Sequence, residues 1–405
     1  MKIINQTLFF GIFFLTFLGY YAILLFLFNS GFSEFSRSVT VPIRVLIMFF
    51  ILTLVWFNRS NLNSNSAIKW FLVFIGIYCY RLFIEYNNDV NYYIPVSDVF
   101  MYFLAFCVVP FLGLVTQKID YKTLNFVFKS FLYGGLVFSI LSIFSYQQFI
   151  GEVARLSESS IGESVLSPLA MSYSSALTIG IMLFYFLTNK VSIKLKIFIL
   201  IIIGISVIPF FLGASRGALI ALIVPLILYF VTGKGVMFFL KAIILLAIFT
   251  MLLVYLDSEL NSGLLDRFLS ISEAIDKGES SAIRAVIWNQ SFNQFIHSPI
   301  IGSTIVVTGW GSYPHNIFIE TLQTTGTLGF ISIFFLTLKG FKSCLHIFRN
   351  HKKYIWVTII FIQAFIQNFF SGALYTAVWF WTGLALVLAT DSFLKKNAKK
   401  FLLNQ

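Results

Sequence analysis

About twelve long apolar runs dominate this sequence, and each is long enough to cross a lipid bilayer as a helix. Inside a bilayer every backbone polar group must be bonded within the protein, and a helix of about 20 apolar residues achieves this. The runs predict an all-α, polytopic integral membrane protein that forms a single integral membrane domain over 1–405. They lie at 7–29, 41–57, 69–86, 96–116, 123–147, 168–188, 195–212, 216–232, 236–256, 323–343, 354–372 and 373–391.

Composition excludes a soluble protein. Hydrophobic residues make up 59% of the chain and charged residues 11%, with a mean hydropathy of +0.90, which no soluble domain could bury. The three cysteines, Cys79, Cys107 and Cys344, lie apart in or beside apolar runs, so neither a disulfide framework nor a metal site is indicated. The first run is too long for a signal peptide and lacks a small-residue cleavage site, so we expect it to be a retained span.

The basic residues predict the orientation of the spans. With the N-terminus inside, 20 of the 28 Lys and Arg fall on the inner side, and 14 of the 16 Asp and Glu fall outside or in spans. Both termini are therefore expected in the cytoplasm. The longest connection, residues 257–322 between the ninth and tenth spans, is expected to be a large periplasmic loop, and a shorter outer segment lies near 149–166.

The two sides differ in residue type as well as in charge. Of the 20 inner basic residues 18 are Lys, whereas seven of the eight outer ones are Arg. Charge alone satisfies the positive-inside rule, so an outer surface that selects Arg suggests bidentate recognition of phosphate or carboxylate. Ion pairing with the outer acidic residues is the alternative for any single Arg. The outer arginines are Arg37, Arg44, Arg81, Arg155, Arg216, Arg267 and Arg284.

Three outer sites resemble one another in construction, because each places a cationic or basic side chain at a predicted helix start. Ser215 is suited to cap a helix with Arg216 in its first turn, and Ser281 a helix with Arg284 in its first turn. Apolar residues recur after Ser281 at helical spacing, as expected of a helix lying in the membrane interface. Pro314 is suited to a first helical position, which would place His315 in the first turn.

Helix N-termini bind anions, since they present free N–H groups and a partial positive charge. An Arg in a first turn is slightly unfavourable for the helix dipole, and a bound phosphate would explain its presence. The alternative for Arg216 is an interfacial anchor that reaches the lipid head groups. For Arg284 the alternative is contact with solvent or head groups.

His315 is the strongest candidate for chemistry. A positive helix end and nearby arginines should lower its pKa and keep the imidazole neutral, able to accept a proton. The alternative is a capping or core histidine. Glu320, five residues later, could orient His315 or pair with an Arg, while His297, His346 and His351 are expected to be loop or solvated residues.

Several chemistries lack their sequence signals. The outer side carries no metal-ligand cluster, the chain contains no Walker or Rossmann glycine loop, and the cytoplasmic connections are too short for a nucleotide-binding domain. An activated donor must therefore arrive already in the membrane. A lipid pyrophosphate, anionic and membrane-held with a good leaving group, fits this requirement.

The motifs "SRGALIAL", "RAVIWNQSFNQFIHSPIIGS" and "PHNIFIETLQTTGTLGF" occur in this order, and together they resemble the O-antigen ligase and O-antigen polymerase family. The stretch 154–177 is similar to an earlier outer loop of that family. The resemblance covers about 150–335, and the remainder matches in span count and hydropathy.

The resemblance implies a GT-C-like, polytopic inner-membrane glycosyltransferase that uses an undecaprenyl-pyrophosphate-linked oligosaccharide, with no metal, cofactor or nucleotide sugar. Carried over by motif, His315 would activate the acceptor hydroxyl, with Asn316 and Glu320 as orienting residues. Arg216 and Arg284 would hold the pyrophosphate. Arg155 is a looser match, because the segment after it lacks the asparagine expected before Pro168. Expected partners are membrane lipids, a chain-length regulator and a flippase, but no nucleic acid.

Polymerase and ligase share this constellation and differ in acceptor, which is another lipid-linked repeat unit or the lipid A core. Chains this rich in Phe and Ile, with a modest loop, resemble divergent polymerases of this family, so an O-antigen polymerase is expected, with ligase as the alternative. A lipid-linked oligosaccharide flippase is a distant alternative, since only Arg81, Glu85 and Lys129 approach the middle of a span. A non-catalytic scaffold would not need His315.

Overall fold

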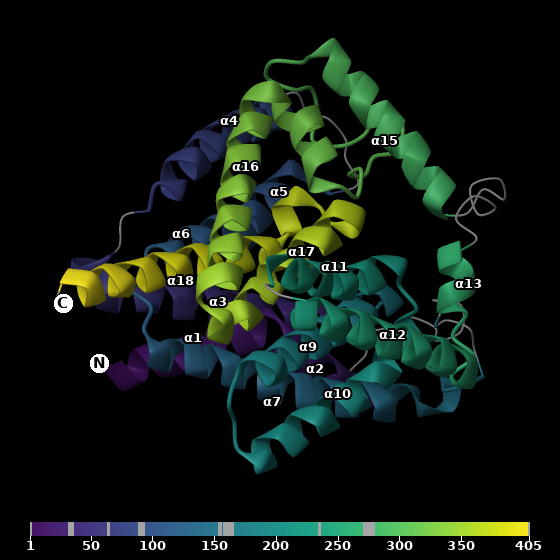
Figure 1. Ribbon diagram of the computed structural model, residues 1–405. Coiled ribbons are helices and arrows are strands. Elements are labelled where there is room, and N and C mark those ends of the chain that lie inside the picture. Colours follow the sequence, from purple (N-terminus) through teal and green to yellow (C-terminus); the bar gives the residue numbers. More distant parts are fainter. Residues whose placement is uncertain are drawn as a thin grey trace. The chain divides into compact units, whose positions relative to one another are not determined.

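The computed structural model describes residues 2–30, 36–62, 65–87, 94–152, 156, 166–233, 236–269 and 280–403 (Figure 1). Within these ranges the chain forms helices and connecting turns and no strand. It divides into two compact units, each built from segments far apart in the sequence. The first unit comprises 1–50, 119–269 and 345–366, and the second comprises 51–118, 270–344 and 367–405. The predicted extent of a single integral domain over 1–405 stays a prediction.

All of the predicted apolar runs coincide with helices. Eight helices in the described part of the chain are long and apolar enough to cross a membrane, and the pair α1–α2, bent by 59°, makes a ninth if counted as one span. The all-α polytopic class is therefore confirmed. The exact count of about 12 spans stays a prediction, because the runs at 216–232, 236–256 and 373–391 form helices outside that set.

The first unit is organised around α9, which packs against α10, α7 and α11, while α1 and α2 pack against α7 (Figure 1). Serine caps begin its helices: Ser167 Oγ accepts from the N–H of Ala170 at 3.2 Å, and Ser215 Oγ accepts from that of Ala218 at 3.4 Å. Its helices are α1 (Lys2–Thr16), α2 (Leu18–Asn29), α3 (Ser36–Asn58, shared with the second unit), α7 (Tyr121–Tyr146), α9 (Pro168–Thr188), α10 (Ile193–Gly213), α11 (Arg216–Thr232), α12 (Val236–Glu259), α13 (Leu264–Leu269) and α17 (Ile355–Ser371, ending in the second unit).

The second unit has an aromatic core. The rings of Phe71 and Phe111 lie 4.2 Å apart, Tyr78 and Phe103 lie 4.4 Å apart, and Trp381 packs 5.1 Å from Phe71. These contacts join α4, α5, α6 and α18 into a support for the candidate site. Its helices are α4 (Ala67–Asn87), α5 (Val96–Phe103) with a π-helical stretch (Leu104–Val108), α6 (Val109–Val115), α15 (Ser280–His297), α16 (Ile317–Asn350, ending in the first unit), the 3₁₀ turn η6 (Leu374–Thr376) and α18 (Val378–Leu403).

The predicted outer loop, 257–322, contains helices of its own. It includes α13 and α15, and the helix expected after Ser281 is therefore present. Ile283, Val286 and Ile296 are exposed on α15 while Ile287 is buried, so the helix presents apolar side chains on its free surface as well as in its packed face. This is the distribution expected of a helix that lies in a membrane interface.

Candidate functional site

His315 lies immediately before α16 in a backbone conformation that favours glycine. Its φ is 58°, in the left-handed region that side chains disfavour. The side-chain oxygen of Asn316 caps the helix, because it accepts hydrogen bonds from the N–H groups of Phe318 (2.9 Å) and Ile319 (3.2 Å). The prediction that Pro314 begins the helix and that His315 lies in its first turn is therefore wrong. Asn316 caps two N–H groups, and the helix starts after it.

Aromatic side chains fix the segment that carries His315. The indole Nε1–H of Trp288, on α15, donates to the carbonyl oxygen of Pro314 at 2.7 Å. The ring of Tyr313 lies 4.5 Å from the His315 imidazole, and Tyr375, on the turn before α18, lies edge-on to Tyr313 at 6.1 Å. The imidazole is thus held from α15 and from the turn between α17 and α18, while remaining half-buried.

Burial is the first cause of a lowered pKa at His315, and the positive charge of Arg284 lowers that pKa further. The sequence predicted this direction from charge alone. Burial also raises the pKa of the neighbouring Tyr313 phenol, with Glu320 as a second cause, so the phenol keeps its proton. The result is a neutral imidazole at the N-terminal end of a helix, close to a cation.

Arg284 is the fifth residue of α15 rather than the third, because the helix begins at Ser280 and not after a cap at Ser281. Its Nη1 donates to the carbonyl oxygen of Phe370 at 2.9 Å. This bond to α17 orients the planar guanidinium. Arg284 and Trp288 are four residues apart and therefore share a face of α15.

Glu320 is fully buried in the first turn of α16 and bonds to the turn before α18. Its Oε2 accepts from the backbone N–H of Leu374 at 2.8 Å, whereas its Oε1 has no hydrogen-bond partner among the described residues. The structure thus gives Glu320 a bond to Leu374 as its contact, and Asn316 the role of helix cap.

Arg216 is the first residue of α11, and Ser215 caps that helix as predicted. Its Nε is buried and has no hydrogen-bond partner in the part of the chain that the structure describes. Arg216 belongs to the first unit, whereas Arg284 and His315 belong to the second. Arg155 lies outside the described residues.

Sequence reasoning missed the turn at 370–376, which supplies the partners of Arg284 and Glu320 and carries Tyr375. Tyr375 lay within the predicted apolar run 373–391, so the sequence did not mark a turn there. It also missed the role of Trp288, which stood out only as an aromatic residue beside an apolar helix face. Among the described residues no group of three His, Cys, Asp or Glu is placed to hold a metal ion.

Comparison with known proteins gives one family. Residues 199–334 match the family model described as O-antigen ligase, a segment that runs from α10 to the middle of α16 and contains Arg216, Arg284 and His315. A comparison with curated proteins found no significant match. The matched segment ends at residue 334, close to the end of the motif resemblance at about 335. Over residues 199–334, the chain is therefore similar to the O-antigen ligase family.

Proposed function

We propose that the protein is an O-antigen (surface polysaccharide) polymerase that acts at the periplasmic face of the bacterial inner membrane. One observation carries this proposal: a half-buried His315, with a lowered pKa, occupies a left-handed backbone position beside Arg284. Such a position costs of order 1–3 kcal/mol for a side chain, and the surrounding structure must impose it.

The proposed reaction moves a glycan from undecaprenyl pyrophosphate to a second lipid-linked repeat unit. A neutral nitrogen of His315 takes the proton of the acceptor hydroxyl, and the acceptor oxygen attacks the anomeric carbon. The bond from that carbon to the pyrophosphate oxygen breaks, and the electron pair leaves with undecaprenyl pyrophosphate. Arg284 stabilises this departing anion, and Arg216 and Arg155 are the further candidates that the motif resemblance supplies. General-base and electrostatic catalysis together would supply several kcal/mol.

Ligase is the second candidate, and the family match supports ligase and polymerase alike. The same histidine and arginines would serve a lipid A core acceptor equally well. The choice between the two depends on the acceptor site.

The flippase alternative loses support from the contacts of the charged residues in α4. A flippase needs charges that line its path, whereas Arg81 is 7% exposed and donates to backbone carbonyls of residues 301, 302 and 324. Glu85 is 3% exposed and lies 3.9 Å from Arg81. Both charges are therefore engaged within the protein.

A deletion strain tests the proposed function through its lipopolysaccharide bands. We expect core bearing a single repeat unit, because ligation continues while polymerisation stops. Core alone, with accumulated lipid-linked polymer, would identify a ligase. An unchanged ladder of long chains would contradict both activities. Plasmid copies of the wild type and of a His315→Ala variant give the matched comparison.

The orientation is tested by cysteine labelling. Thr308 is exposed in the described part of the outer segment, so Thr308→Cys, in a chain with Cys79→Ala, is expected to react with a membrane-impermeant maleimide in cells whose outer membrane alone is permeabilised. Lys190→Cys, exposed in a connection predicted to be cytoplasmic, is the matched control and should react only after lysis. The reverse pattern would contradict the predicted orientation, in which the termini are cytoplasmic and His315 is periplasmic.

A further inference from the structure

Helix α16 is broken nine residues after it begins. Gly326 has φ 62° and ψ −162°, so the stretch Ile317–Thr325 is a short half-helix followed by a longer one. After Gly326 the helix resumes in the apolar run that follows. A break within a membrane-spanning helix exposes backbone groups, which the surrounding protein must satisfy.

Residues 299–303, within the predicted outer loop, satisfy these groups. The N–H of Ser303 donates to the carbonyl of Gln323 at 2.7 Å, and the N–H of Thr327 donates to that of Pro299 at 2.8 Å. The two backbones cross so closely that a Cβ added at Gly302 would lie 2.3 Å from the carbonyl carbon of Thr324, with an equivalent clash at Gly326. Glycine is therefore required on both sides of the crossing.

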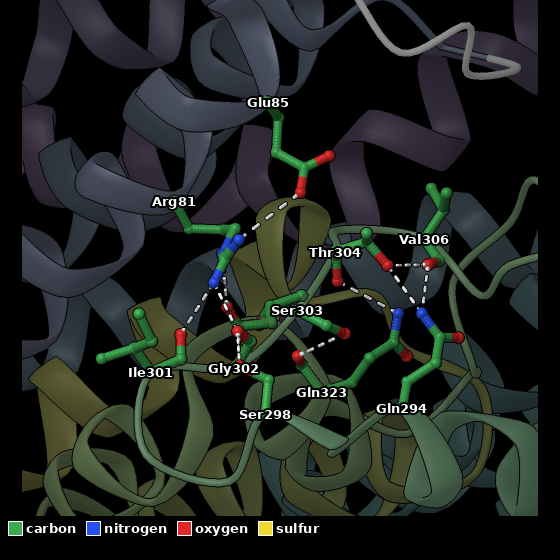
Figure 2. Close-up of polar contacts among 11 residues, drawn as sticks. Arg81, Glu85, Gln294, Ser298, Ile301, Gly302, Ser303, Thr304, Val306 and Gln323 are labelled. Atoms are coloured by element: carbon green, nitrogen blue, oxygen red, sulfur yellow. Dashed lines mark hydrogen bonds and ion pairs between the residues drawn. The ribbon is translucent and has the colours of Figure 1, made fainter. Parts of the chain in front are cut away.

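Arg81, on α4, fastens this crossing from a buried position. Its Nη2 donates to the carbonyls of Ile301 at 3.1 Å and Gly302 at 2.5 Å, and its Nε donates to the carbonyl of Thr324 at 3.2 Å. Figure 2 shows the guanidinium directed at the loop carbonyls with the Glu85 carboxylate on its other side. One planar group thus bonds both crossing segments, a geometry that a lysine ammonium does not reproduce.

We propose that Arg81 is a positioning residue for His315. The half-helix Ile317–Thr325 is a rigid rod of about 13 Å. Arg81 and Ser303 fix its C-terminal end, and Asn316 and His315 stand at its N-terminal end. Tilting the rod at the crossing displaces the imidazole from Arg284 and Trp288, which approach from α15. The inference rests on the proposed role of His315 and adds a residue outside the matched segment 199–334.

The directions of its donors show that Arg81 acts through other residues. Nε and Nη2 are bonded to backbone carbonyls, and Nη1 faces Glu85, so the guanidinium is committed to the protein. An ionisable residue buried at this depth in a span needs such a reason, because removal from water is costly. The buried charge of Arg81 is bonded to the crossing, and this crossing sets the direction of the half-helix.

The test compares wild type, Arg81→Gln, Arg81→Lys and the control Arg59→Gln, whose side chain stacks on Trp56 at the end of α3. Hydrogen exchange of peptides covering 298–330 is measured on the purified proteins in nanodiscs. Arg81→Gln is expected to accelerate exchange at Ser303 and Thr327, and Arg59→Gln to leave it unchanged. Unchanged exchange in Arg81→Gln would overturn the fastening role, whatever the function of His315.

Kinetics on lipid-linked substrate then distinguish a role of Arg81 in positioning His315 from a role in folding alone. Arg81→Gln is expected to lower kcat by about 10–100-fold, since a displacement of about 1 Å can cost 10²-fold, while KM changes by less than about threefold. The acid limb of the pH profile should move to higher pH as His315 leaves its buried place near Arg284. Arg81→Lys keeps the charge, serves as the folded comparison if Arg81→Gln does not accumulate, and should restore less than half of the lost kcat. Faster exchange with normal kcat and an unmoved acid limb, or full rescue by Lys, would overturn the proposal. Activity in His315→Gln would instead contradict the proposed function.

Discussion

Replacing His315 by glutamine is expected to reduce glycan transfer by about 10²–10⁴-fold, the contribution of a positioned general base. The amide preserves a hydrogen bond but cannot take the acceptor proton. Its size and polarity suit the half-buried site between Tyr313 and Arg284, so membrane insertion and protein level should remain normal. The rate is measured on purified protein with lipid-linked substrate. Polymer formed at close to the normal rate would reduce His315 to a structural residue.

The pH profile adds a second readout to this prediction. Burial and Arg284 lower the pKa of His315, so the imidazole stays neutral at physiological pH and becomes protonated only below the ordinary imidazole range. Activity should therefore be present above that pKa and fall as the pH drops through it, and this limb should vanish in the residual activity of His315→Gln. His297→Gln is the matched control: His297 ends α15, and its Nδ1 contacts the carbonyl oxygen of Asn293 at 2.7 Å. It should leave rate and profile unchanged.

Arg284→Lys is expected to lower the rate nearly as far as Arg284→Ala, by about 10²-fold or more, the effect of removing one donor to a developing anion. The planar guanidinium is oriented by its bond to the Phe370 carbonyl, and an ammonium does not reproduce the fixed directions of its N–H groups. The acid limb of the pH profile distinguishes the effect of the Arg284 charge from the effect of its geometry. It should move to higher pH in Arg284→Ala, because the loss of a positive charge raises the pKa of His315, and should move less in Arg284→Lys.

Arg59→Lys provides the matched control for this exchange. Arg59 stacks on Trp56 at the end of α3, and its replacement should leave transfer and the pH profile unchanged. Full activity of Arg284→Lys at a normal protein level would show that Arg284 serves as a membrane anchor. An unmoved acid limb in Arg284→Ala would show that its charge does not reach His315.

The helices could be predicted from the sequence because each depends on local information. The length of an apolar run predicts a span. Ser215 predicts the start of α11, because its side chain bonds a backbone N–H only three residues ahead. The start of α16 was placed too early for the same reason. Pro314 and Asn316 both suit a helix start, and the bond from Trp288 to Pro314, from another helix, accompanies the left-handed turn at His315.

The candidate site could be predicted only in part, because its residues are assembled across long separations. His315 and Arg284 stood out by type and by place. The groups that bond them did not stand out. Arg284 and Glu320 bond backbone atoms, of Phe370 and Leu374 respectively. Every residue has such atoms, so the sequence does not show which ones will serve. Arg81 looked like an isolated charge in a span until its bonds to distant carbonyls were seen.

Three sets of bonds have a consequence for protein engineering. They join Arg284 to Phe370, Glu320 to Leu374, and Arg81 to the crossing at Gly326. All three link the matched segment, 199–334, to residues outside it. That segment is thus not a transplantable cassette. A chimera in which a relative supplies only 199–334 would retain the catalytic side chains and lose the fit of their supports. Joining points that carry α4 and residues 367–377 along with the segment should preserve both.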